Sequence, residues 1–144
     1  MLERFVTAQD AGGTFDRALA ELRAGAKVSH WMWFVFPQLA GLGTSPTARH
    51  YALADTAAAR AYLAHPLLGP RLAQATEAML GWAGRRSAQS VLGPVDALKF
   101  ASSITLFEHV ADSSASDFGR ALDAFYDGRR DGRTLSLLGL APSS

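Results

Sequence analysis

The chain has 144 residues, 49% of them hydrophobic and 19% charged, so it holds enough apolar material for one domain with a buried core and too little charge to be disordered. Fourteen basic and thirteen acidic residues leave a formal net charge of +1, which gives no sign of binding to bulk nucleic acid or to a membrane surface. There is no cysteine, no signal-peptide pattern and no apolar run of ~18 residues, which excludes disulfide and thiolate chemistry and makes the cytoplasm the expected location.

The first part of the chain predicts two helices. Residues 2–9 form a short helical pattern that ends before the glycine pair 12–13. Thr14 is predicted to cap the second helix, in which apolar residues recur at helical spacing as far as Leu22. Gly25 then supplies the stop.

An aromatic segment, residues 29–38, is the most unusual part of the chain. It holds two of the three tryptophans, and four of its aromatic residues fall within six positions. A short apolar run of this kind is also typical of a buried strand. No second good strand candidate exists, however, and one strand cannot satisfy its own backbone hydrogen bonds. We therefore expect a buried helical or irregular segment that ends at Pro37.

Capping residues, glycines and prolines place the remaining helices. Ser45 followed by Pro46 predicts a helix that carries Tyr51 and Leu53. The clearest pattern is a regular apolar stripe from Asp96 to Ala111. The other helices are expected over residues 56–65 after a cap at Asp55, 68–82, between the cap Ser87 and Gly93, around 118–125, and over Thr134 to Leu140.

No internal repeat, low-complexity segment or domain boundary interrupts these elements. The expected structure is therefore all-α, a single compact domain over residues 1–144 with about seven to nine short-to-medium helices around an aromatic-rich core. Residues 141–144 are expected to be frayed.

The usual signatures of catalysis and cofactor binding are missing. There is no phosphate-binding loop with a lysine, no dinucleotide fingerprint, no nucleophile elbow and no histidine pair at zinc spacing. The four histidines stand apart at positions 30, 50, 65 and 109. We expect no metal site and no bound cofactor.

One face of the helix that begins near Asp96 carries polar residues. Asp96, Lys99, Ser102 and Ser103 fall within a sector of roughly 120° at helical spacing. A lysine flanked by hydroxyl groups on so apolar a helix could bind phosphate or carboxylate. In the plainer interpretation Asp96 is an N-cap, Lys99 is a solvated surface charge and the serines fill tight helix contacts.

The aromatic segment offers further candidates. His30 beside Trp31 is a candidate general acid or base in an aromatic-walled pocket, or else a histidine that only hydrogen-bonds at the edge of the core. Trp31 and Trp33 are either core residues or a ligand platform, and a helix cannot turn all the aromatics inward. Gln38 stands at the polar end of the segment. Arginines within residues 129–133 could clamp an anion or lie in a solvated loop.

Three blocks of the sequence resemble the bacterial family catalogued as domain of unknown function 1810. They are residues 29–43, residues 62–72 and residues 96–107, and the resemblance covers nearly the whole chain. Members are sometimes labelled calpastatin-like, a label that these residues do not support. The resemblance implies a small helical cytoplasmic protein and no established activity.

Residues 46–51, followed downstream by Lys99-Phe100, are similar to a motif of the NADAR superfamily. That helical group is associated with N-glycosidic cleavage in riboflavin-related and ADP-ribose chemistry. Its motif has an acidic residue directly before the His-Tyr pair, whereas Arg49 stands there in this chain. The departure removes the obvious catalytic acid or base, so the resemblance does not carry the reaction over.

Two functional hypotheses follow. In the first, a phosphorylated, nucleotide-like or ADP-ribose-like molecule binds between the aromatic segment and the Lys99 helix, with glycosidic hydrolysis as the first reaction to consider. Trp31 or Trp33 would stack on it, His30 would donate or accept a proton, and the remaining contacts would come from Gln38, Arg49, Tyr51, Asp96, Lys99, Ser102 and Ser103.

In the second hypothesis the chain is a non-catalytic interaction or self-association module, such as a homodimer, with the aromatic segment as its core. Burial separates the two hypotheses. A structure in which Trp31, Trp33 and His30 are sealed in and Lys99 points into bulk water would leave no site.

Overall fold

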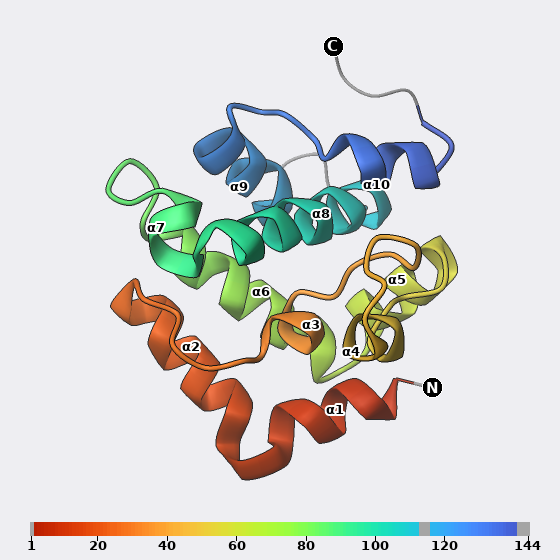
Figure 1. The fold of residues 1–144 in the computed structure, drawn as a ribbon, viewed down its shortest axis with the longest axis horizontal. Helices are drawn as coiled ribbons and strands as arrows, with labels where there is room; N and C mark the ends of the chain where they lie inside the picture. Colours follow the sequence, from red (N-terminus) through yellow and green to blue (C-terminus); the bar gives the residue numbers. More distant parts are fainter. Residues whose placement is uncertain (1, 113–115, 141–144) are drawn as a thin grey trace.

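The computed structural model describes residues 2–112 and 116–140, and within them the fold is all-α (Figure 1). These residues contain no strand, only an isolated parallel bridge between Leu39 and Leu53. The expected all-α class is confirmed. The elements are α1 (Glu3–Asp10), a 3₁₀ turn (Ala11–Gly13), α2 (Thr14–Ala24), α3 (Met32–Val35), α4 (Pro46–His50), α5 (Thr56–Ala64), α6 (Leu68–Leu80), α7 (Ala88–Leu92), α8 (Pro94–Val110), α9 (Asp117–Tyr126) and α10 (Gly132–Leu137).

Helix α8 lies at the centre of the molecule. It packs against α5, α7, α9 and α10, and Figure 1 shows it crossing the middle of the view below α9 and α10. Every residue from Ala101 to Phe107 is buried. The expected one-sided apolar stripe is therefore too narrow, because even the serine and threonine side chains of this helix are enclosed.

Aromatic rings link the helices in the core, as the sequence predicts. The ring centroid of Phe36 lies 4.9 Å from that of Phe100 on α8 in an edge-on contact. Tyr62 on α5 contacts Phe5 at 5.2 Å and Phe107 at 5.4 Å. Such edge-on and tilted pairs are the favoured arrangements for aromatic rings. The aromatic segment thus joins α8 through its buried rings.

Several helices begin at side-chain caps, and three of these caps, Ser45, Asp55 and Ser87, are the ones that the sequence predicts. The side chains of Ser45, Asp55, Ser87 and Ser116 each accept a hydrogen bond from the backbone N–H three residues on. Gly25, in the left-handed conformation, ends α2 as expected. Residues 113–115, just before the cap Ser116, lie outside the described residues.

Several boundaries differ from those predicted, and four of them concern residues singled out above. Thr14 is the first residue of α2 rather than its cap, and its hydroxyl donates to the carbonyl of Ala11. Helix α4 ends at His50, so Tyr51 and Leu53 lie beyond it. Helix α8 begins at Pro94, which rules out Asp96 as its N-cap. Helix α10 begins at Gly132 because Asp131 caps it, two residues earlier than expected.

Within residues 2–112 and 116–140, no helix combines the length and the apolar character that crossing a bilayer requires. The predicted fraying of residues 141–144 lies outside the described residues.

Candidate functional site

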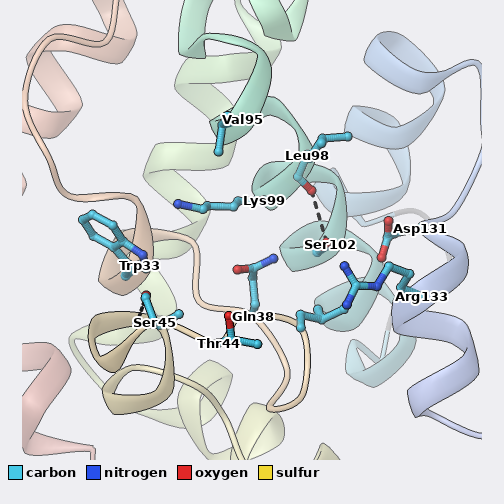
Figure 2. Close-up of a pocket in the computed structure, with 13 residues that line it drawn as sticks. Trp33, Gln38, Thr44, Ser45, Val95, Leu98, Lys99, Ser102, Asp131 and Arg133 are labelled. Carbon is cyan, nitrogen blue, oxygen red and sulfur yellow. Dashed lines mark hydrogen bonds between the residues drawn. The ribbon is translucent and has the colours of Figure 1, made fainter.

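A cleft of about 460 Å³ opens between the aromatic segment, the loop that follows it, the first half of α8 and the start of α10 (Figure 2). We call it the cationic cleft. The side chains that give it its chemical character are Trp33, Gln38, Lys99, Ser102, Asp131 and Arg133. The aromatic segment and the helix that carries Lys99 therefore meet at Trp33.

Lys99 is held against the indole of Trp33. Its Nζ lies 4.6 Å from the ring centroid, and the face of an indole attracts a cation. The same Nζ lies 3.5 Å from Oδ1 of Asp96, one helical turn earlier. The Lys99 side chain is only 23% exposed. It is therefore not the solvated surface charge of the plainer interpretation.

Asp96 forms a second ion pair, with Lys27, that the sequence alone does not predict. Nζ of Lys27 lies 2.9 Å from Oδ2 of Asp96, and the Lys27 side chain is only 8% exposed. The two lysines of the sequence therefore share one carboxylate. One negative charge between two positive ones leaves an excess of positive charge at the Trp33 end of the cleft.

The opposite end of the cleft is formed by α10. Figure 2 shows the Gln38 amide between Lys99 on one side and the Arg133 guanidinium on the other. In the part of the chain that the structure describes, Arg133 forms no ion pair. Ser102 donates its hydroxyl to the carbonyl of Leu98 at 3.1 Å, so its oxygen can still accept a hydrogen bond from a ligand.

Apolar side chains form the rim of the same cleft. Val95 and Leu98 on α8 are 65% and 68% exposed. Leu42 and Ala48 line the cleft from the loop side. Inside this rim the cleft wall holds two cations, Lys99 and Arg133, and one carboxylate, Asp131. Because the cations outnumber the carboxylate, the cleft suits a ligand that has both an anionic and an apolar part.

The loop over residues 38–45 is fixed by backbone contacts. Leu53 donates its N–H to the carbonyl of Gln38 at 2.9 Å, and Ala40 donates to the carbonyl of Leu53 at 2.8 Å. A β-carbon on Gly43 would lie 2.5 Å from that of Ala48, so only glycine allows the loop to approach α4 this closely. The loop wall is thus part of the fold.

A second hollow, of about 490 Å³, lies beside the first and shares Trp33 with it. We call it the aromatic hollow. Its walls are formed by His30, Trp33, Phe34, Pro46, Thr47, His50 and Tyr51. Tyr51 is packed against Phe34 at 5.3 Å and against His50 at 4.7 Å between ring centroids. His30 and Tyr51 therefore border this hollow rather than the cationic cleft.

The start of the aromatic segment is held by Glu21 on α2. The carboxylate accepts hydrogen bonds from the N–H groups of Val28 and Ser29, the Ser29 hydroxyl and the Trp31 indole N–H, all between 2.5 and 3.0 Å. Burial by itself would raise the pKa of Glu21, but these hydrogen bonds outweigh it and lower the pKa from 4.5 to about 2. Glu21 is therefore ionised and fixes the direction in which the segment enters the core.

The remaining predicted residues lie away from both cavities. Trp31 is completely buried and serves as a core residue. Ser103 is also completely buried, and its hydroxyl has no hydrogen-bond partner in the structure. Arg49 is exposed on α4 and borders neither cavity, although its neighbours Ala48 and His50 do. Asp96 lies behind Lys99 rather than in the wall.

Sequence reasoning missed several of the residues that matter here, and it named Arg133 only within a charged loop. Lys27, Glu21 and His50 were not singled out, and the one available signal was that the chain has only two lysines. Among residues 2–112 and 116–140, no group of three or more histidine, aspartate or glutamate side chains is placed to hold a metal ion.

Comparisons with known proteins show the family of the chain. The model of the family described as protein of unknown function, DUF1810, matches residues 1–138. The crystal structure of the conserved hypothetical protein Rv1873 from Mycobacterium tuberculosis is similar, with 46% sequence identity, a TM-score of 0.90 and 97% of each chain covered. A comparison with curated proteins finds no match. The chain therefore belongs to the DUF1810 family of proteins of unknown function.

Proposed function

We propose that the cationic cleft binds a phosphate-bearing, nucleotide-like small molecule. The observation that carries the proposal is the placement of Lys99 and Arg133 on opposite sides of Gln38 in one cleft. The volume of about 460 Å³ lies within the range of about 300–1,000 Å³ that is usual for small-molecule sites.

The two cations differ in a way that suits phosphate. Arg133 is exposed and can turn its planar guanidinium to meet two phosphate oxygens at once. Lys99 is already fixed over Trp33, so it loses little freedom when an anion approaches. Asp96 faces Lys99 but shares its charge with Lys27, which limits its repulsion of an anion.

Whether the protein also catalyses a reaction on the bound molecule is a question separate from binding. Glycosidic hydrolysis and a catalytic role of His30 stay predictions, as does a cytoplasmic location. His30 is exposed and borders the aromatic hollow, where a water molecule could reach a ligand held at Trp33. Product analysis by chromatography, after incubation with the ligand that binds best, would test whether hydrolysis occurs.

Titration of intrinsic tryptophan fluorescence tests the binding proposal. Inorganic phosphate, pyrophosphate, ribose 5-phosphate, mononucleotides and ADP-ribose are the probes. Arg133→Gln should weaken the best ligand by on the order of tenfold, since a lost hydrogen bond to a charged group costs about 1.5–3 kcal/mol. Arg129→Gln is the matched control, because it removes the same charge from an exposed arginine that does not border the cleft.

No signal from any probe at millimolar concentration would refute the proposal, as would an equal loss in the two arginine variants. The alternative, a self-association module, rests on the exposed apolar side chains Val95 and Leu98. Light scattering tests it directly. A strict monomer up to high concentration would exclude a homodimer.

A further inference from the structure

We propose that the aromatic hollow is a second subsite of the same ligand site, and that it takes the planar ring of a nucleotide whose phosphates occupy the cationic cleft. This inference rests on the proposed function and specifies its ligand class. The observation behind this inference is that the two cavities lie side by side and share one wall. Trp33 borders both cavities, and α4 with the residues beside it contributes Ser45 and Ala48 to one and Thr47 and His50 to the other.

The position of Lys99 decides which cavity receives the ring. Its ammonium lies over the Trp33 indole at 4.6 Å from the centroid, so this part of the ring system is already covered from the side of α8. A flat group that stacked there would have to displace the cation from both Trp33 and Asp96. A ring that stacked on the part of the half-buried indole bordering the aromatic hollow would not have to displace Lys99.

The two cavities also differ in charge. The aromatic hollow has no lysine, arginine or carboxylate in its wall. It offers the rings of Trp33 and Tyr51, the imidazoles of His30 and His50 and the hydroxyl of Thr47. Aromatic faces bind a nucleobase by stacking, and imidazole and hydroxyl groups can hydrogen-bond to its edge.

The walls of the hollow are held in place before any ligand arrives. Ser45 caps α4, and Arg4 donates from Nε to the carbonyl of His50 at 2.8 Å and from a terminal nitrogen to the carbonyl of Ala52 at 3.0 Å. The Tyr51 ring contacts the rings of Phe34 and Phe5. A rigid aromatic wall of this kind binds a ring at little cost in side-chain entropy.

Calorimetric titration with inorganic pyrophosphate, ADP, GDP and UDP tests the arrangement. At least one nucleoside diphosphate should bind more tightly than pyrophosphate by on the order of tenfold, the gain expected for one stacked base. His50→Ala should remove most of that gain and change pyrophosphate binding by less than about twofold, because the two subsites act independently. Arg133→Gln should weaken the binding of both pyrophosphate and the nucleoside diphosphates.

His109→Ala is the control, because His109 is an exposed histidine on α8 that borders neither cavity. Melting temperatures establish that each variant is folded. Pyrophosphate binding without any gain from a base would overturn the second subsite and leave the proposed function standing. So would an equal effect of His50→Ala on pyrophosphate and on the diphosphates. Failure of every probe, pyrophosphate included, would refute both proposals.

Discussion

The ammonium group of Lys27 lies 2.9 Å from Oδ2 of Asp96, and this ion pair ties the residues just before the aromatic segment to the first turn of α8. Lys27 Nζ also donates to the carbonyl of Ser29 at 2.7 Å and lies 5.1 Å from the ring centroid of Trp31. One lysine thus joins the backbone, an indole and a carboxylate from two separate parts of the chain.

A double-mutant cycle with Lys27→Met and Asp96→Asn measures this link. Because the pair is largely shielded from water, we expect a coupling energy of about 1–2 kcal/mol in urea unfolding. The pair Asp117–Arg120 on α9, which is more exposed to water, provides the comparison, with an expected coupling of less than about 0.5 kcal/mol. Equal coupling in the two pairs would contradict the role assigned to Lys27.

Glu21 makes the free energy of unfolding depend on pH in the acidic range. Its pKa is about 2 in the folded protein against an ordinary value of 4.5, so the unfolded chain takes up a proton first. The carboxylate therefore stabilises the fold above pH 4.5, and this contribution is lost as the pH falls from 4.5 towards 2.

Replacement of Glu21 by Gln should lower the free energy of unfolding at pH 7 by on the order of 2 kcal/mol, a value reduced for the partial exposure of the group. Between pH 4.5 and 2, the variant should lose less stability than the parent protein. Urea titrations at several pH values measure both effects. Glu77→Gln, at an exposed site on α6, should change stability at pH 7 by less than about 0.5 kcal/mol.

Gly43 controls the distance between the cleft loop and α4. Gly43→Ala would place a β-carbon 2.5 Å from that of Ala48, and neither atom can move without its backbone. We expect a loss of about 1–3 kcal/mol in stability, the usual cost of overpacking. The second change Ala48→Gly should restore part of it, because it removes the other partner of the clash.

Gly132→Ala is the matched control for the loop, since open space surrounds that position. Thermal melts of the three variants give the comparison. If Gly43→Ala melted with the parent protein, the close approach of the loop to α4 would be wrong.

Gln9 is a buried polar residue that connects α1 to α3. Its Nε2 donates to the carbonyl of Phe34 at 2.7 Å and to the hydroxyl of Tyr62 at 3.1 Å. Gln9→Leu should lower the free energy of unfolding by about 1–3 kcal/mol, because it leaves buried polar groups with fewer partners. Gln74→Leu on the exposed face of α6 should have a much smaller effect, and chemical unfolding of the two variants distinguishes them.

The fold was largely predictable because its signals are local. The caps at Ser45, Asp55 and Ser87 and the stop at Gly25 act within one turn of their own helix, so the sequence alone reveals them. The boundaries at Thr14 and Asp96 were wrong because other neighbouring residues, Gly13 and Gly93, occupy the cap positions.

The site was only partly predictable because it depends on contacts between distant residues. Of the residues that the first hypothesis names, Trp33, Gln38, Lys99 and Ser102 line the cleft. Arg49 does not, because successive residues of a helix point about 100° apart, and its neighbours Ala48 and His50 face the two cavities instead. Nothing in the local sequence pairs Lys27 with Asp96 or Glu21 with Ser29.

The central position of α8 has a consequence for how the two walls of the cleft exchange with solvent. The buried part of α8, residues 101–107, is packed against other helices, so its amide hydrogens should exchange with deuterium only when the whole protein unfolds. The opposite wall, residues 38–45, is held to the fold mainly by the short bridge to Leu53 and should open locally and exchange much faster. A ligand in the cleft would therefore slow hydrogen exchange chiefly in the loop. The exchange rates of the buried α8 amides would serve as a reference within the same molecule.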